Sequence, residues 1–417
     1  MKQKFIIVFF IIILIITNFL SISLADSELS NSLNITAESA ILIDNNSGKI
    51  LYRKNEKEKK YPASTTKIVT AIIAIENFNL SDKVTVGYNA ISAVPSGYSV
   101  ASLQVGEELT IEQLLQVLLI HSANDAANVL AEHIGGTIES FATIMNTKAQ
   151  EIGCENTHFT NPSGKHDDNH YTTAYDLSLI MQYCMKNPTF RRIAGSKSCI
   201  IPKTNKYEQR VFSNTNELLI VDSKKEPDNN YYQYAIAGKT GYTSQAKNCL
   251  VSSANKDNFE LICVVLGSGL DYNGLNYRFI DSKKVFEYGY NNYTIKKLKE
   301  KGSVAKQIEI PNGSKETKNL DLLISDDITA IIKHSENDIS PEIKLNDNLV
   351  APISKSQILG TITYTIDGTE YTANLQASHS VEKIDYSIIL VQLLLFIFTI
   401  FILSIMLCSK KQKYKKK

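Results

Sequence analysis

The sequence predicts an α+β domain in which helices pack on an antiparallel sheet, followed by a small all-β domain and a C-terminal transmembrane helix. Strand-like patterns begin and end the region 26–295, and apolar residues at helical spacing fill the part between them. Residues 296–385 change to short alternating runs, which are typical of strands. Residues 386–408 are almost entirely apolar, and the tail 409–417 that follows them is mostly lysine.

Residues 1–25 have the three-part pattern of a secretory signal peptide. Lys2 and Lys4 precede an apolar run from Phe5 to Ile16, and small residues then lead to Ala25, where we expect cleavage. The alternative is an uncleaved anchor helix. In both cases the chain is expected to be exported.

The region 26–295 begins with a predicted pair of strands and continues with helices. The stretch ESAILIDNNSGKILYRKN has two strand-like runs on either side of a turn at Asn45–Gly48. Pro62 then opens a helix that is expected to run through Phe78, because apolar residues recur at helical spacing. Four further helices are predicted at 110–120, 125–134, 138–153 and 172–187.

The second half of this region has strand-like patterns again. Three successive antiparallel strands are predicted at 234–243, 247–254 and 259–268, and a helix near 282–293 closes the domain. A helical layer in the middle of the sequence, with strands before and after it, is the pattern expected of helices packed on an antiparallel sheet.

The six cysteines lack the spacing of zinc or redox sites, and they are too few for a disulfide scaffold. A turn at Asn255–Asn258 would place Cys249 nearly opposite Cys263. Two interpretations stay open for this pair, a disulfide bond or two small buried side chains in the centre of a sheet.

The region 296–385 is predicted to be a spacer between the larger domain and the membrane. Asp367–Gly368, between two alternating runs, is the strongest short-range signal for a hairpin. The region offers no plausible cluster of nucleophile, acid and base.

The C-terminal apolar segment, Ser387–Cys408, is long enough to just cross a hydrocarbon core of about 30 Å. The lysine-rich tail predicts that its far end is cytoplasmic and contacts anionic lipid headgroups. Residues 26–386 are therefore expected to lie outside the cell membrane. A helix lying flat in the interface is disfavoured, because the segment has no polar face.

Composition excludes some partners and cofactors. The net charge is +1, and no basic stripe with interleaved aromatic residues is present, so we expect no nucleic-acid partner. His166 and His170 are four residues apart, a spacing that binds zinc on a helix, but they lie in a predicted loop. We therefore predict no metal and no other cofactor.

Three short motifs carry the candidate chemistry. They are Ser64–Lys67 (Ser-Thr-Thr-Lys), Ser122–Asn124 (Ser-Ala-Asn) and Lys239–Gly241 (Lys-Thr-Gly). Each is weak alone, since a serine at a helix start is usually a cap and a Ser-x-Asn loop can cap a helix. Each also lies on a different kind of element: a helix start, a loop between helices and a strand.

The first two motifs supply a nucleophile and a base. A spacing of three residues places Ser64 and Lys67 on one helix face, so that the amine can take the proton of the hydroxyl. The lysine must be partly neutral for this, which burial and nearby positive charge favour. Ser122 could relay a proton to a leaving amine, and Asn124 could hold a peptide carbonyl.

The third motif suits a substrate that ends in a carboxylate. Lys239 offers a charge and Thr240 a hydroxyl group, while Gly241 allows the strand backbone to lie close to a substrate. The joint occurrence of the three motifs matches the signature of penicillin-binding proteins and serine β-lactamases.

The chain resembles the low-molecular-weight penicillin-binding proteins that act as D-alanyl-D-alanine carboxypeptidases. The resemblance covers roughly residues 36–380 and includes the stretches NTHFTNPSGKHDDNHYTTAYDLSLIM and FIDSKKVFEYGY. It implies the fold of the penicillin-binding and β-lactamase transpeptidase domain. It also implies removal of the terminal D-alanine from peptidoglycan stem pentapeptides through an acyl-enzyme on Ser64, and acylation of the same serine by β-lactams.

The resemblance also assigns further residues. Backbone N–H groups of Ser64 and Tyr242 would form the oxyanion hole, and Arg278 is a candidate second contact for the substrate carboxylate, with a structural salt bridge as its alternative. Many relatives have histidine where this chain has Tyr242. Relatives often attach to the membrane by an amphipathic helix, whereas a spanning segment is predicted here.

Two other functions remain possible from the sequence. A class A β-lactamase needs a glutamate that activates the deacylating water, and the nearest candidate is Glu217. Those enzymes also usually have aspartate where this chain has Ala123. The other possibility is a non-enzymatic envelope protein that binds peptidoglycan.

Overall fold

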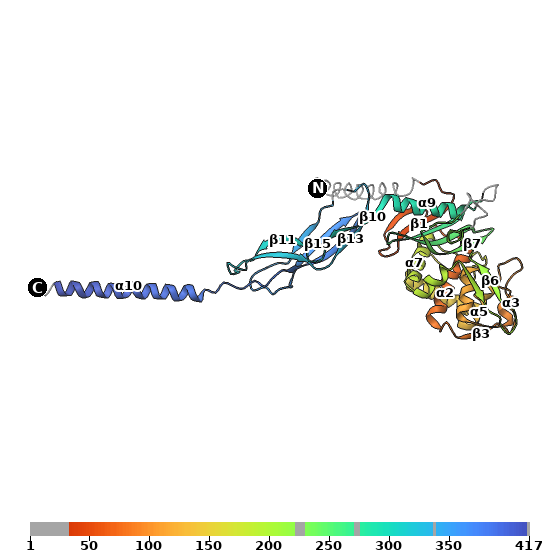
Figure 1. Cartoon of the computed structure of the whole chain (residues 1–417), viewed down its shortest axis with the longest axis horizontal. Coiled ribbons are helices and arrows are strands. Elements are labelled where there is room, and N and C mark those ends of the chain that lie inside the picture. Colours follow the sequence, from red (N-terminus) through yellow and green to blue (C-terminus); the bar gives the residue numbers. More distant parts are fainter. Residues whose placement is uncertain (1–32, 222–229, 271–275, 337–338, 415–417) are drawn as a thin grey trace, which may run out of the picture. The chain divides into compact units, whose positions relative to one another are not determined.

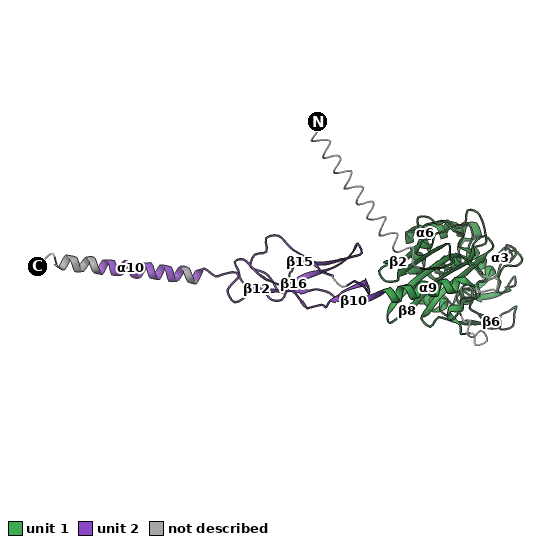
Figure 2. Cartoon of the chain, turned by 90° about the horizontal axis from the view of Figure 1, so that it is seen from above, with its two compact units in different colours: residues 1–292 green, residues 293–417 purple. Residues whose placement is uncertain are grey.

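The structure is a computed structural model of the whole chain and describes residues 33–221, 230–270, 276–336 and 339–414 (Figure 1). It divides into two compact units, unit 1 (residues 1–292) and unit 2 (residues 293–417), which are coloured separately in Figure 2. The predicted signal peptide, residues 1–25, lies outside the described residues.

Unit 1 is built on a five-stranded antiparallel sheet with the strand order β2-β1-β9-β8-β7. The two early strands join the three late ones at the β1–β9 pair, where Leu42 lies opposite Cys263. Figure 1 shows α9 on one side of the sheet and α7 and α2 on the other. The predicted α+β architecture is therefore confirmed. The strands are β1 (Ser39–Asp44), β2 (Ile50–Lys54), β7 (Ala235–Thr243), β8 (Lys247–Lys256) and β9 (Phe259–Ser268).

The register of the β8–β9 hairpin differs from the sequence-based prediction. The turn consists of two residues, Asp257 and Asn258, both with positive φ (52° and 65°), which is the backbone of a tight hairpin turn. Cys263 consequently lies opposite Ser252, while Cys249 lies opposite Gly241 on the other neighbouring strand. The two thiols are free and buried, so the expected juxtaposition was wrong.

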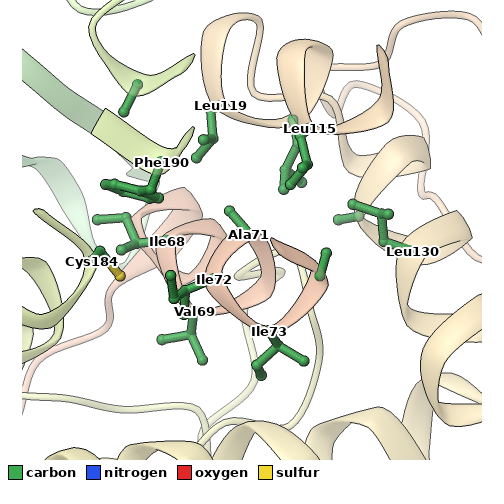
Figure 3. Close-up of a cluster of buried hydrophobic side chains, with 14 of the residues drawn as sticks. Ile68, Val69, Ala71, Ile72, Ile73, Leu115, Leu119, Leu130, Cys184 and Phe190 are labelled. Atoms are coloured by element: carbon green, nitrogen blue, oxygen red, sulfur yellow. The ribbon is translucent and has the colours of Figure 1, made fainter. Parts of the chain in front are cut away.

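The helical layer surrounds α2 (Lys67–Asn77), whose first eight residues, Lys67 to Ala74, are all buried. Figure 3 shows its side chains facing Leu115, Leu119, Leu130 and Phe190 from neighbouring helices. The residues just before α2 are therefore fixed to the core of the unit. The other helices are α3 (Tyr88–Ser92), α4 (Ile111–Ile120), α5 (Asn124–Gly135), α6 (Ile138–Ile152), α7 (Ala174–Met185), α8 (Pro188–Ala194) and α9 (Tyr277–Asn292).

Local sequence signals explain several helix ends. The Thr173 side chain accepts a hydrogen bond from the Asp176 N–H (3.0 Å) and caps α7, which lies within the helix predicted at 172–187. Thr110 and Gln113 form a reciprocal capping box at the start of α4. Gly136 is the C-cap of α5, and its φ of 76° is a conformation that glycine adopts readily. Short antiparallel ribbons complete unit 1: β3 (Lys83–Thr85) with β4 (Glu108–Thr110), and β5 (Ser198–Ile201) with β6 (Arg210–Ser213).

A buried carboxylate ties the start of the sheet to α9. Asp281 is fully buried and accepts hydrogen bonds from the N–H and hydroxyl of Thr36 (3.0 and 2.8 Å). It also accepts from the Ala37 N–H and the Ser268 hydroxyl, both at 2.9 Å. Its charge is thus compensated by four donors from the segment before β1 and the end of β9.

Unit 2 contains a five-stranded antiparallel sheet with the order β11-β12-β16-β15-β14 and a separate β10–β13 pair. The predicted hairpin is confirmed, since Asp367 and Gly368 have positive φ and connect β15 to β16. Alternate residues of the strands, such as Leu320 and Leu322, form its core. The strands are β10 (Tyr293–Lys299), β11 (Val304–Glu309), β12 (Asn319–Ile324), β13 (Ile328–Lys333), β14 (Glu342–Leu345), β15 (Ile358–Ile366) and β16 (Thr369–Ala377).

The predicted transmembrane helix at 386–408 is not supported. Residues in this region form α10 (Ser387–Tyr414), but within the described part of the chain no helix has the length and apolar character that crossing a bilayer requires.

Replacing Asp281 tests the link between the sheet and α9. We expect Asp281→Ala to lower the free energy of unfolding by about 3 kcal/mol, because four buried donors lose their acceptor. Urea unfolding of the full chain measures the change. The exposed carboxylate Glu155 provides the control, and Glu155→Ala is expected to change the stability by no more than about 0.5 kcal/mol. Equal effects of the two substitutions would contradict the proposed link.

Candidate active site

Ser64 and Lys67 meet through a single turn of 3₁₀-helix. This turn, η1 (Ala63–Thr66), precedes α2, and Pro62 rather than Ser64 is its N-cap. Because a 3₁₀-helix has three residues per turn, the side chains of residues 64 and 67 are stacked one above the other. The Ser64 Oγ and the Lys67 Nζ are 2.9 Å apart.

The Lys67 amine is completely buried and has two other partners. Its Nζ lies 2.9 Å from the Asn124 Oδ1 and 2.7 Å from the Ser163 carbonyl oxygen. Burial, and then the positive charge of Lys239, hold the pKa of Lys67 well below its usual value. A neutral amine has two N–H groups, which these two oxygens accept, so its lone pair faces the Ser64 hydroxyl.

Lys239 and Thr240 come from β7, the edge strand of the sheet beside η1. The Thr240 side chain lines the cleft, whereas Lys239 is buried beneath the surface and donates to the Thr240 carbonyl (3.0 Å). Burial, with a smaller effect of the Arg278 charge, lowers the pKa of Lys239 to about 7. Lys239 therefore influences the cleft mainly through its charge.

Ser122 and Asn124 lie between α4 and α5. Ser122 has a φ of 66°, an uncommon conformation for a residue with a side chain, and its backbone is held by the ends of two helices. Asn124 uses both ends of its amide, since Oδ1 accepts from Lys67 and Nδ2 donates to the Ser99 carbonyl (2.8 Å). In this structure Asn124 thus orients the lysine, a role that the sequence analysis did not foresee.

These residues surround one cleft with a volume of about 480 Å³. Among the described residues that line it, none carries a carboxylate. Lys67 and Lys239 lie beneath its surface, and the side chain of Tyr242 is 57% exposed at its rim. The lining brings together these residues singled out from the sequence: Ser64, Ser122, Asn124, Thr240, Gly241, Tyr242 and Arg278.

Arg278, at the start of α9, lines the cleft beside β7. Its guanidinium donates to the Gly241 carbonyl (2.9 Å) and to the Asn276 Oδ1 (3.0 Å), both of which are uncharged acceptors. A guanidinium has five N–H donors, so further donors remain for a ligand. This position is compatible with a contact to a substrate carboxylate.

Two glycines allow the chain to close around η1. A Cβ atom on Gly241 would lie 2.8 Å from the Pro62 carbonyl oxygen and 3.1 Å from the Ser64 nitrogen. A Cβ on Gly164, whose φ is 80°, would lie 1.8 Å from the Ala63 carbonyl oxygen. The close approach at Gly241 is therefore to the turn that carries Ser64, whereas the sequence analysis expected an approach to substrate.

His170 fixes the loop that carries Ser163. It is only 2% exposed, its Nδ1 accepts from the Thr160 N–H (3.0 Å), and its Nε2 lies 2.8 Å from the Thr66 Oγ1. Burial lowers the pKa of His170 to about 3, so the ring is neutral and its Nε2–H donates to Thr66. Within the described residues, no group of His, Cys, Asp or Glu side chains could hold a metal ion.

Two contributors to the site were missed from the sequence. The Thr215 hydroxyl lies in the cleft, 2.6 Å from the Thr240 hydroxyl. Its sequence context, Asn214–Asn216, resembles an ordinary loop. The other contributor is the carbonyl oxygen of Ser163, and a backbone atom leaves no mark in the sequence. The neighbouring Gly164 is a signal in the sequence, because a glycine can mark a place where two backbone segments come close together.

Comparison with known families gives a match over most of the chain. Residues 26–269 match the profile described as D-alanyl-D-alanine carboxypeptidase. Residues 293–383 match the profile of the C-terminal domain of penicillin-binding protein 5.

Individual relatives agree with this result. The chain is 33% identical over 350 residues to D-alanyl-D-alanine carboxypeptidase DacF of Bacillus subtilis. The matched region covers 82% of this chain and 85% of the relative. It is also 33% identical to DacA of Haemophilus influenzae, with 83% and 86% covered. Among solved structures, penicillin-binding protein 5 of H. influenzae has 31% identity and a TM-score of 0.65, with 85% of this chain and 99% of that chain covered.

The contact of Gly164 with η1 can be tested by adding one methyl group. We expect Gly164→Ala to lower the free energy of unfolding by more than about 3 kcal/mol, because its Cβ overlaps the Ala63 carbonyl. Gly136→Ala is the matched control, since Gly136 has a similar φ of 76° but open space around its Cβ. Its cost is expected to be about 1 kcal/mol from backbone strain alone. Similar losses in urea unfolding would show that the contact contributes nothing.

Proposed function

Because the chain belongs to the D-alanyl-D-alanine carboxypeptidase family and is a penicillin-binding serine peptidase, we propose that Ser64 is its nucleophile and Lys67 the base. The observation that carries this proposal is the 2.9 Å separation between the Ser64 Oγ and the buried Lys67 Nζ. The proposed substrates are peptidoglycan stem pentapeptides, from which the terminal D-alanine is removed. β-Lactams acylate the same serine.

Acylation follows from this arrangement. The Ser64 Oγ attacks the carbonyl carbon of the penultimate D-alanine while its proton passes to the Lys67 Nζ. The oxyanion that forms is stabilised by the backbone N–H groups of Ser64 and Tyr242. The C–N bond then breaks, and the leaving amine of the terminal D-alanine takes a proton, which Ser122 relays from Lys67.

Hydrolysis of the acyl-enzyme releases the shortened peptide and restores Ser64. A water molecule attacks the ester, and Lys67 again serves as the base. A class A β-lactamase uses a glutamate for this step, but Glu217 is not among the described residues that line the cleft. Bound penicillin is therefore expected to be hydrolysed slowly, over minutes or longer.

The substrate carboxylate is proposed to bind in the part of the cleft beside β7 and Arg278. The hydroxyls of Thr240 and Thr215 and the guanidinium of Arg278 are available to it at the surface. Lys239 contributes positive charge from below, which supports binding of an anion although its amine does not line the cleft.

We also propose where the enzyme acts. Peptidoglycan lies outside the cell membrane, so the catalytic unit is proposed to work on the extracellular side. The signal-peptide pattern in residues 1–25 supports export.

Replacing Lys67 tests the assignment of the base. We expect Lys67→Ala to slow acylation by fluorescent penicillin at least about 1,000-fold, because the hydroxyl loses its proton acceptor. Gel fluorescence over time measures the rate, and thermal unfolding shows that the variant is folded. Lys203→Ala, at an exposed lysine, is the control and should react normally. A folded Lys67→Ala variant with a near-normal rate would refute the assignment.

The two lysines predict a bell-shaped dependence of kcat/KM on pH for a peptide substrate. The value of kcat/KM rises with pH as Lys67 loses its proton. It falls as the pH increases through about 7, because Lys239 of the substrate-free enzyme loses its charge there. A neutral ester, which has no carboxylate to bind, is expected to lack the alkaline decrease. Lys239→Ala should lower kcat/KM for the peptide more than for the ester and remove the alkaline decrease. The role of Lys239 is wrong if both substrates lose activity equally.

A further inference from the structure

A second cavity, the side cavity, adjoins the catalytic cleft. It has a volume of about 350 Å³ and is lined by Glu38, Lys59, Tyr61, Asp168 and Tyr171, among others. Gln245, on the turn after β7, lines both the side cavity and the cleft. A molecule that follows β7 along the cleft therefore meets the side cavity where the strand ends.

The walls of the side cavity are fixed by contacts between distant segments. The backbone N–H of Lys60 donates to the Thr172 carbonyl (2.7 Å), and the Thr172 N–H donates back (2.9 Å). The rings of Tyr61 and His166 meet edge to face with 4.8 Å between their centroids. The Lys60 ammonium also donates to the Glu38 carboxylate (2.8 Å). The cavity is thus formed in advance and needs no rearrangement to accept a group.

The side cavity presents accessible charges of both signs. The Asp168 side chain is 90% exposed, and its carboxylate lies 3.5 Å from the His166 Nε2. The Lys59 Nζ lies 4.1 Å from the centroid of the Tyr171 ring. A purely anionic group would meet Asp168 and Glu38, and a purely cationic group would meet Lys59 and Lys60. A group with one charge of each sign is complementary to both.

The direction of the substrate follows from the proposed function, on which this inference rests. The terminal carboxylate lies at Thr240 and the scissile carbonyl at the Tyr242 N–H, so the peptide continues toward Thr243 and Gln245. An extended peptide advances about 3.3 Å per residue. The residue third from the carboxyl end of the substrate therefore comes beside Gln245, within reach of the side cavity.

We propose that the side cavity binds the side chain of this third residue, and that it selects a side chain ending in both an ammonium and a carboxylate group. Asp168 accepts hydrogen bonds from the ammonium, and Lys59 pairs with the carboxylate. A diamino-dicarboxylic acid has such an end, whereas lysine has only the ammonium. The side cavity thereby distinguishes stem peptides by a residue that takes no part in the reaction.

Three pentapeptides that differ only at the third residue test the proposal. They carry meso-diaminopimelate, L-lysine or L-norleucine before D-alanyl-D-alanine, and the measurement is kcat/KM for release of D-alanine by the full chain. We expect the diaminopimelate peptide to exceed the lysine peptide by about tenfold, an effect of the size that one charge-assisted hydrogen bond gives. Asp168→Asn and Lys59→Gln should each reduce this preference to about twofold or less.

Two controls separate the side cavity from the catalytic cleft. Asp257→Asn changes an exposed aspartate on the β8–β9 turn, at the far end of β8, and is expected to retain the full preference. Benzylpenicillin contains no diamino acid, so its acylation rate reports whether Ser64 is intact in each variant.

The possible results give distinct answers. Equal kcat/KM values for the three peptides, with normal acylation by penicillin, would overturn the side-cavity proposal and leave the proposed function standing. A preference that persists unchanged in both Asp168→Asn and Lys59→Gln would also overturn it, because recognition would then lie elsewhere. If neither penicillin nor any of the peptides reacts with the wild type, the proposed function itself fails.

Discussion

The burial of the Lys67 amine is the constraint that the rest of unit 1 has to satisfy. A buried amine is costly unless its polar atoms have partners, and those partners come from three separate parts of the chain. Ser64 lies one 3₁₀ turn before it, Asn124 begins α5, and the Ser163 carbonyl belongs to the loop before α7. The helical layer therefore has to place a turn, a helix start and a loop within 3 Å of one atom.

Such convergence leaves little space, and the structure meets it with residues that tolerate crowding or strain. Gly164 lies in the loop before α7 and Gly241 lies in β7. Both approach η1 so closely that a Cβ atom would overlap backbone atoms of the turn. Ala63 has a positive φ of 47° in the same turn, a strained conformation for a residue with a side chain. The burial of α2 in the apolar core offsets this strain, because η1 leads directly into α2 and is held in place by its packing (Figure 3).

The sequence predicted those features that depend on local chemistry. The five strands of the large sheet of unit 1 and the helices α2, α4, α5, α6, α7 and α9 follow from periodicity, whereas the short elements α3, α8 and β3 to β6 were not predicted. The hairpin at Asp367–Gly368 follows from its turn residues, and the α+β architecture from the order of the elements. Features that depend on register or backbone atoms could not be predicted. Cys249 and Cys263 are separated because a two-residue turn shifts the hairpin, and Thr215 reaches the cleft only through the fold. Apolar composition also predicted a spanning helix that the described residues do not support.

The two buried lysines explain why the site suits a substrate that carries a negative charge. Two ammonium groups buried near each other repel, and both pKa values are lowered as a result of burial and of neighbouring positive charge. The reaction needs unequal states, with Lys67 neutral to accept a proton and Lys239 charged to attract an anion. A carboxylate bound at Thr240 lies next to Lys239 and favours its charged form, and that charge in turn disfavours a proton on Lys67. A substrate without the carboxylate lacks this effect, so the group that marks the end of the peptide also helps to maintain the protonation states that catalysis requires.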